Sequence, residues 1–145
     1  QLYYSGLTGW QAGATREGSI QRLRFTGEKG LYLQKAIARK GRLELSFNSP
    51  VKDVSDDGWD ATAWNYRWSK QYGSPHFKVS EPGVEGVDTL TIKNIDRAKD
   101  GRTLIVNIPD LQPCHTLKLN FSVKGEDATE LSGPVYFTIH ELPES

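Results

Sequence analysis

The feature that most constrains this chain is the alternation of apolar and polar residues in short segments that end at glycine, proline, aspartate or asparagine. The clearest segment places Leu117, Leu119, Phe121 and Val123 at alternate positions, with polar side chains between them. Successive side chains of a β-strand point to opposite faces, so this pattern predicts a strand with one buried face and one wet face. Helical spacing of apolar residues is almost absent. The sequence therefore predicts an all-β domain.

The same alternation recurs along the chain, in segments that can each bury one face. These segments are 42–47, which stops at Asn48-Ser49-Pro50; Leu90 with Ile92; 104–108, after a turn at Asp100-Gly101; and 135–139, after Gly133-Pro134. We expect Leu90 with Ile92 and 104–108 to form a hairpin, and Pro134 to begin its strand. With an aromatic stretch at 62–69 and a short segment at 76–80, about seven strands are expected from residue 42 onward. Two packed antiparallel sheets bury one face of every strand, so the predicted fold is a β-sandwich.

Residues 1–40 differ from the rest because glycines punctuate them repeatedly. Strand-like runs at 19–26 and 31–38 predict a β-hairpin or an extra layer joined to the sandwich. We therefore expect an N-terminal β extension over 1–40 and a sandwich over 41–145. A start at Gln rather than Met is what a mature form or an excised part of a longer protein would show.

The charge balance gives no general reason to bind nucleic acid or anionic lipid. The chain has 18 basic and 18 acidic residues, whereas proteins that bind such partners usually carry a basic excess. No segment approaches the roughly 20 apolar residues that span a bilayer. The single cysteine, Cys114, excludes an intramolecular disulfide framework. We expect neither a nucleic-acid partner nor a membrane span.

Several motifs carry a resemblance to a known family. They are Phe47-Asn48-Ser49-Pro50-Val51, Trp64-Asn65-Tyr66, Asp100-Gly101-Arg102-Thr103-Leu104 and Ile108-Pro109-Asp110-Leu111. Together they resemble a bacterial Ig-like family. The fuller pattern, through Tyr72-Gly73-Ser74, is similar to a module near the end of large secreted proteins of planctomycetes and verrucomicrobia. Those proteins often combine a sugar-dehydrogenase-like propeller with c-type haem domains, and residues 6–11 and 18–27 are similar to the stretch that closes the propeller.

The resemblance implies an Ig-like sandwich that serves as an accessory module of an oxidative, polysaccharide-related protein. It implies a secreted or periplasmic location, neighbouring domains as partners and a plant or algal polysaccharide as ligand. It implies no redox chemistry in this chain, because Cys114 stands alone and the haem-attachment pattern C-x-x-C-H is missing.

The most informative local feature is a group of five large aromatic side chains within a short stretch. They are Trp59, Trp64, Tyr66, Trp68 and Tyr72. If 64–68 is extended, its three aromatic residues project from one face, about 6.6 Å apart. Sugar rings stack well on indole and phenol rings, so the group predicts a carbohydrate-binding surface. The alternative is that the row is core, since sandwiches of this type commonly bury a tryptophan on a central strand. We expect at least one of its three residues to lie in the core.

Metal sites receive weaker support. Asp53, Asp56, Asp57 and Asp60 surround Gly58 and could gather oxygen ligands for calcium, but long turns also favour Asp and Gly. A transition-metal site needs His76, Cys114, His115 and His140 to converge, with no local ligand spacing to support it. By alternation, His115 shares the core-facing phase of Leu117, and His140 lies in the opposite phase of its own strand.

No catalytic motif is evident. Carboxylate pairs such as Glu81 with Glu85 have nothing to place them across a cleft, and no nucleophile elbow or phosphate-binding glycine loop is present. The sequence predicts a non-catalytic carbohydrate-binding module that needs no cofactor. The alternative is a structural Ig-like spacer that docks against other domains or holds them apart. A third, weaker hypothesis is a metal-dependent oxidative enzyme.

Overall fold

A computed structural model describes residues 2–6, 18–27, 30–54, 57–70 and 72–144. The chain divides into two compact units, Gln1–Gly30 and Leu31–Ser145, and each is considered by itself. All regular structure in the described ranges is β-strand, so the all-β prediction is confirmed. Within the same ranges, no helix is long and apolar enough to cross a membrane.

The first unit is a two-stranded antiparallel ribbon. Strands β1 (Leu2–Gly6) and β2 (Ser19–Leu23) pair from Leu2 opposite Leu23 to Gly6 opposite Ser19. Every residue of both strands is exposed, so the described part of the ribbon has no core of its own. The connecting residues 7–17, which carry part of the propeller-like resemblance, lie outside the described residues.

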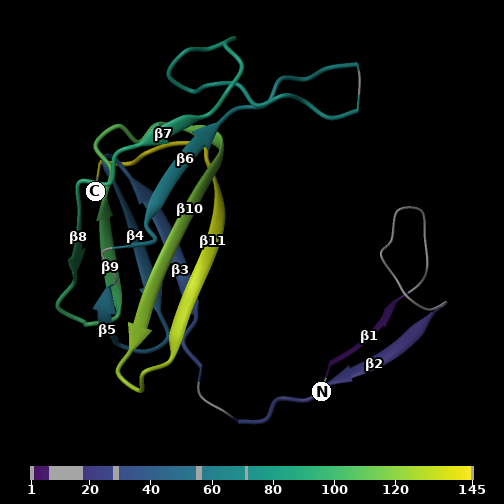
Figure 1. The fold of residues 1–145 in the computed structure, drawn as a ribbon, viewed down its shortest axis with the longest axis vertical. Coiled ribbons are helices and arrows are strands. Elements are labelled where there is room, and N and C mark those ends of the chain that lie inside the picture. The colour runs from purple at the N-terminus through teal and green to yellow at the C-terminus, as the bar shows by residue number, and fades with distance from the viewer. Residues whose placement is uncertain (1, 7–17, 28–29, 55–56, 71, 145) are drawn as a thin grey trace. The chain divides into compact units, whose positions relative to one another are not determined.

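The second unit is a sandwich of two antiparallel sheets (Figure 1). One sheet has the order β11-β10-β6-β7, and β5 also pairs with β10. Its strands are β5 (Val51–Val54), β6 (Asp60–Trp64), β7 (Asp88–Leu90), β10 (Cys114–Gly125) and β11 (Glu130–Ile139). The other sheet has the order β3-β4-β9-β8. Its strands are β3 (Leu33–Arg39), β4 (Arg42–Phe47), β8 (Asn94–Arg97) and β9 (Thr103–Asn107).

The core lies between the two sheets and follows the predicted alternation. Apolar side chains from both sheets form one buried cluster, to which β4, β9 and β10 each contribute alternate residues. Phe47 of β4 meets Phe121 of β10 with ring centroids 6.2 Å apart. Burial of every second side chain removes one face of each sheet from water, which is the main favourable contribution to folding.

The boundary between the units differs from the predicted one. Strand β3 pairs along β4, from Arg39 opposite Arg42 to Leu33 opposite Phe47, so residues 31–40 belong to the sandwich rather than to the N-terminal extension. Gly41, at φ 73°, allows the tight turn between the two strands. The runs at 19–26 and 31–38 consequently do not pair with each other, because β2 takes β1 as its partner.

The predicted hairpin between Leu90 with Ile92 and 104–108 is wrong. Leu90 pairs with Ala61 in one sheet, whereas β9 lies in the other sheet and forms its hairpin with β8. The Asp100 carboxylate holds the turn of that hairpin by accepting the N–H groups of Arg102 and Thr103, each at 2.9 Å. Alternation marks a half-buried strand but does not say which sheet it joins.

Pro134 lies inside β11, opposite Asn120, instead of beginning the strand. Strand β11 stands at the edge of its sheet. A proline, which has no N–H to donate, is accepted in an edge strand because one side of that strand has no neighbour to bond.

Candidate functional site

A long connection between β6 and β7 extends beyond the end of the sandwich (Figure 1). We call residues 65–87 the excursion. Asn65 and Phe77 close its base by exchanging two backbone hydrogen bonds of 2.7 and 2.9 Å, and Phe77 bridges to Glu85. The predicted strand at 76–80 is therefore a single bridge position. Phe77 is buried, so the base of the excursion is packed as well as hydrogen-bonded.

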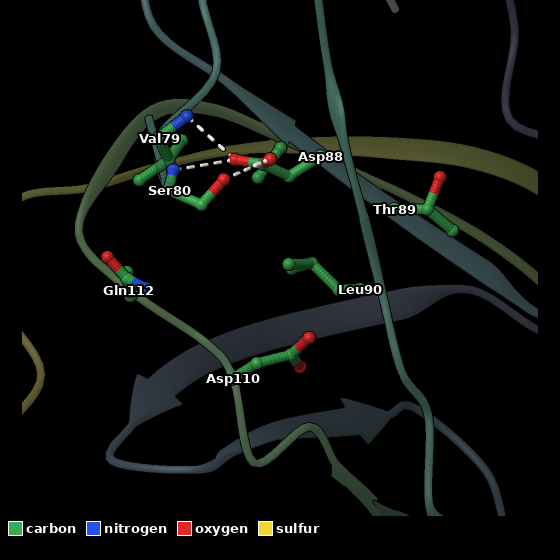
Figure 2. Close-up of a pocket in the computed structure, with 8 residues that line it drawn as sticks. Val79, Ser80, Asp88, Thr89, Leu90, Asp110 and Gln112 are labelled. Carbon is green, nitrogen blue, oxygen red and sulfur yellow. Dashed lines mark hydrogen bonds between the residues drawn. The ribbon is translucent and has the colours of Figure 1, made fainter. Parts of the chain in front are cut away.

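The carboxylate of Asp88 secures the point where the excursion returns to β7. Figure 2 shows it accepting the N–H groups of Val79 and Ser80, at 2.7 and 2.8 Å, and the Ser80 hydroxyl at 2.6 Å. Desolvation raises the pKa of Asp88, but these hydrogen bonds and the charge of Lys78 outweigh it and lower that pKa below its ordinary 3.8. Asp88 thus acts as an anionic clamp within the fold.

A pocket of about 180 Å³ adjoins this clamp (Figure 2). Its lining consists of Ala63, Val79, Ser80, Asp88, Thr89, Leu90, Asp110 and Gln112. Both oxygens of Asp88 are already used by the excursion, and one oxygen of Asp110 accepts the Thr91 N–H at 3.3 Å. The polar groups that this pocket gathers largely serve the junction between the excursion and the body of the sandwich.

The predicted aromatic group divides between the interior and the surface. Strand β6 ends at Trp64, so the alternation that would place Trp64, Tyr66 and Trp68 on one face does not continue. Their exposed fractions rise along the chain, from 7% through 44% to 95%. Tyr72 is fully exposed. The excursion therefore presents Tyr66, Trp68 and Tyr72 to solvent, while Trp64 belongs to the interior.

Trp59 and Trp64 are packed by other rings. Trp59 is half-buried, with its ring centroid 5.8 Å from that of Phe121 in the core. Trp64 stacks on His76 at 4.6 Å with an interplanar angle of 22°. Both indole Nε1 atoms are buried and complete no hydrogen bond to the described residues. The burial of Trp64 confirms the prediction that at least one residue of the row Trp64, Tyr66 and Trp68 lies in the core.

Tyr66 is fixed where the excursion leaves the body. Its backbone N–H donates to Nδ1 of His115 at 2.9 Å, and the His115 N–H donates to Oδ1 of Asn65 at 2.9 Å. The Tyr66 ring lies edge-on to His76 at 5.8 Å and parallel to His115 at 6.3 Å. This network orients the first exposed aromatic side chain of the excursion.

The predicted core-facing phase of His115 is wrong, and the reason is a β-bulge. Pairing along β10 jumps from Cys114 opposite Ile139 to Leu117 opposite Phe137, so β10 holds one extra residue there. The extra residue restores Cys114 to the buried face and turns His115 outward. Simple alternation counted back from Leu117 cannot detect that insertion.

Beside Tyr66 lies a shallow hollow of about 280 Å³. Its lining consists of Asn65, Tyr66, Arg67, Phe77, Lys78, Pro82, Gly83 and His115. The Trp64 indole N–H, although it completes no hydrogen bond within the described ranges, and the Thr116 hydroxyl both favour the phenolate of Tyr66 and so lower the pKa of its phenol. The hollow brings aromatic, amide and cationic groups together at the base of the excursion.

One of the predicted calcium ligands, Asp60, is hydrogen-bonded to another side chain. Asp60 accepts two hydrogen bonds from the Asn120 amide, at 2.8 and 3.0 Å, and Asp57 is exposed. Asp56 lies outside the described residues. Among the residues that are described, no group of three or more His, Cys, Asp or Glu side chains is arranged to hold a metal ion.

Three of the four residues considered for a transition metal do line one hollow. Cys114, His115 and His140 border a space of about 270 Å³, while His76 lies on the excursion. Desolvation raises the pKa of the buried Cys114 to about 11, which keeps the thiol protonated at neutral pH. A protonated thiol is a poor metal ligand and a poor nucleophile.

Sequence reasoning missed the hollow as a unit. Its lining comes from the end of β6, from Phe77 and Lys78, from Pro82 and Gly83, and from the bulge of β10. The one available signal was the long spacing between Trp64 and Leu90 with no clean alternation in it, which is typical of a functional loop.

Comparison with models of known protein families and with curated proteins finds no match for this chain. The resemblance to a bacterial Ig-like module stays a prediction, and the functional argument rests on the geometry of the site.

Proposed function

We propose that this chain is a non-catalytic carbohydrate-binding module of a secreted bacterial multidomain protein. Polysaccharide binds by stacking sugar rings on the exposed aromatic side chains of the excursion, Tyr66, Trp68 and Tyr72. Trp59 and Trp64, which were part of the predicted site, act instead as packing residues, because Phe121 and His76 lie against their rings.

The observation that carries the proposal is the exposure of Trp68, which is 95% exposed. Tryptophan is highly buried on average, because its large ring gains most from leaving water. The exposed indole of Trp68 and the fully exposed ring of Tyr72 offer apolar surface that another molecule can cover. Sugar rings present C–H groups on their faces and match such rings well.

The anchoring of the excursion supports the same function. The Asn65–Phe77 bridge, the Asp88 clamp and the hydrogen bond from Tyr66 to His115 fix its base at three places. A ligand that stacks on the excursion therefore meets a partly ordered surface, which reduces the entropy lost on binding.

The decisive experiment is affinity gel electrophoresis of the chain against a panel of polysaccharides, followed by Trp68→Ala. We expect retardation by at least one polysaccharide and a loss of about tenfold or more in affinity, as for a central aromatic contact. Tyr136→Ala is the matched control, since Tyr136 is an exposed aromatic residue that belongs to β11 and not to the excursion. The proposal fails if no polysaccharide retards the chain, or if both variants bind as the parent does.

A specific observation also favours the second candidate, a docking role for the N-terminal ribbon. Paired strands β1 and β2 expose apolar residues on both faces, with Leu2 opposite Leu23 on one and Ile20 opposite Ser5 on the other. An isolated two-stranded ribbon is marginally stable in water, so a neighbouring domain that covers it would stabilise it.

Hydrogen exchange tests the docking role. In this chain alone, we expect the amides of 2–6 and 19–23 to exchange far faster than those of β10, because nothing in the described part of the ribbon is buried. In a longer polypeptide that contains the docking domain, the ribbon amides should become protected. Equal exchange of the ribbon in both settings would rule the docking role out.

A further inference from the structure

The charges of the excursion are divided along its length, with its cations in 67–78 and its two acids, Glu81 and Glu85, in the part that returns to β7. Residues 61–80 contain Arg67, Lys70 and Lys78 but no aspartate or glutamate, although the whole chain holds equal numbers of basic and acidic residues. The exposed aromatic side chains of the proposed site lie in this same stretch. The cations of the excursion therefore share a stretch of sequence with the surface that is available for stacking, and its acids follow that stretch.

Arg67 is the cation that the structure positions best. Its Cζ atom lies 5.1 Å from the centroid of the Phe77 ring, and Phe77 is itself buried at the base of the excursion. A cation–π contact of this kind holds the guanidinium plane while leaving N–H groups free for another partner. The backbone N–H of Arg67 also donates to Oγ of Ser74 at 3.0 Å, which fixes the main chain at this residue.

The neighbouring lysines differ from Arg67 in their partners. Lys78, in the same hollow, donates to Oε1 of Glu81 at 2.8 Å, and that hydrogen bond and charge raise the pKa of Lys78. Within the described ranges, neither Arg67 nor Lys70 forms an ion pair with a carboxylate. The hollow beside Tyr66 thus contains a held guanidinium that no acid of the described residues neutralises.

We infer that the polysaccharide bound by the excursion is acidic, and that Arg67 recognises a carboxylate or sulfate group of a sugar whose ring stacks on Tyr66 or Trp68. This inference rests on the proposed function and adds the ligand's charge to it. The guanidinium fork matches the oxygens of a carboxylate or sulfate, so one residue can select for charge while the rings supply contact area.

An acidic polysaccharide fits these groups better than a nucleic acid does. A nucleic acid carries one phosphate per nucleotide, and proteins that bind it use several cations to neutralise the backbone. The excursion offers few unpaired cations, on a chain of net charge zero. A chain of sugars with spaced acidic groups needs no more than one such contact for each stacked ring.

The test uses pairs of ligands that differ only in charge. Polygalacturonate is compared with its fully methyl-esterified form, and dextran sulfate with dextran, by affinity electrophoresis or calorimetry on the full chain. We expect binding to the acidic member of at least one pair, about tenfold or more weaker binding to its neutral counterpart, and weakening as salt is raised. Which pair responds distinguishes a carboxylate from a sulfate ligand. A single-stranded oligonucleotide is tested beside them.

Variants then test Arg67 itself. We expect Arg67→Gln to lower affinity for the acidic polysaccharide about tenfold, and Arg67→Lys to recover only part of the loss, because lysine keeps the charge but not the planar fork. Lys99→Gln is the matched control, since Lys99 is an exposed cation in the turn between β8 and β9, at the other end of the sandwich from the excursion (Figure 1). We expect that control to bind as the parent does.

Each failure has a distinct signature. Binding to no polysaccharide, acidic or neutral, contradicts the proposed function as a whole. Equal binding to acidic and neutral members, or an Arg67→Gln variant as tight as Lys99→Gln, overturns the inference while leaving stacking intact. Tighter binding to the oligonucleotide than to every polysaccharide overturns both in favour of nucleic acid. Circular dichroism of each variant confirms that the sandwich is folded.

Discussion

Tryptophan is buried in the body of the sandwich but exposed in the excursion. Trp64, the last residue of β6, is buried and stacked on His76. Trp68, which follows in the excursion, is exposed to solvent. In the body, apolar side chains alternate with polar ones along each strand and are buried between the two sheets. In the excursion, ordering comes from hydrogen bonds and from one buried ring, that of Phe77, while the large aromatic side chains remain outside.

The free energy of folding comes mainly from the side chains that leave water. Area removed from water stabilises the fold by about 25 cal/mol for each Å², so Trp64 and the core residues contribute and Trp68 contributes little. A large ring that does little for folding remains available for contact with a ligand. Exposure thus separates the aromatic residues that stabilise the fold from those that remain free to contact another molecule. Stability measurements on single variants test this separation.

The largest effect is expected in the body, at Leu119. This side chain is fully buried in the centre of β10, so Leu119→Ala should lower the free energy of unfolding by about 2–5 kcal/mol, measured by urea denaturation. Lys118→Ala is the control, because Lys118 is the adjacent residue on the opposite face. Equal losses for the two variants would contradict the assignment of the buried face.

The next effect is expected at the clamp between body and excursion. Asp88→Ala removes three hydrogen bonds to a charged carboxylate and should lower the free energy of unfolding by about 1–2 kcal/mol, with exposed Asp57→Ala as the control. The lowered pKa of Asp88 fixes the pH dependence. Its ionised form is favoured in the native state, so the contribution is complete above the ordinary value of 3.8 and is lost as pH falls through the lower native value.

Denaturation of parent and variant across acidic pH measures this dependence. The difference in stability between parent and Asp88→Ala should be constant near neutral pH and should shrink below about pH 4. A difference that grows on acidification would mean that the protonated form of Asp88 is the favoured one.

A smaller effect is expected where Tyr66 leaves the body. His115→Ala removes the acceptor of the Tyr66 N–H and should cost about 1 kcal/mol in unfolding free energy. His115→Asn offers an oxygen near the position of Nδ1 and should recover part of the loss. Hydrogen exchange of the Tyr66 amide reports the same bond directly, and unchanged protection in His115→Ala would show that the bond does not anchor the excursion.

The sequence predicts the body far better than the excursion, because burial in a sheet leaves a local pattern. Alternation alone predicts the buried faces of β4 and β10, which consist of Leu43, Leu45 and Phe47 in β4 and include Leu117 and Leu119 in β10. No local sequence pattern indicates which of the two sheets a strand joins. Leu90 and Leu104 therefore seemed to belong to one hairpin although they lie in different sheets.

The site depends still more on contacts between distant segments. The hollow needs Arg67, Phe77 and His115 together, and the outward position of His115 follows from one inserted residue in β10. The five-residue aromatic group includes the rings that the excursion exposes, those of Tyr66, Trp68 and Tyr72. It could not say which rings are buried, because that depends on where β6 ends and on the packing of His76 and Phe121.

The smallest effect on stability is expected at Trp68, and it is the sharpest test of the comparison. Because the side chain is almost wholly exposed, Trp68→Ala should change the free energy of unfolding by less than about 0.5 kcal/mol. It should also lower the tryptophan fluorescence that acrylamide can quench, since Trp68 is almost wholly exposed whereas Trp64 is buried and Trp59 half-buried. A loss of stability comparable to that of Leu119→Ala, or unchanged quenching, would place Trp68 in the interior. A neutral effect on folding combined with a loss of polysaccharide binding would show that this ring serves the ligand rather than the fold.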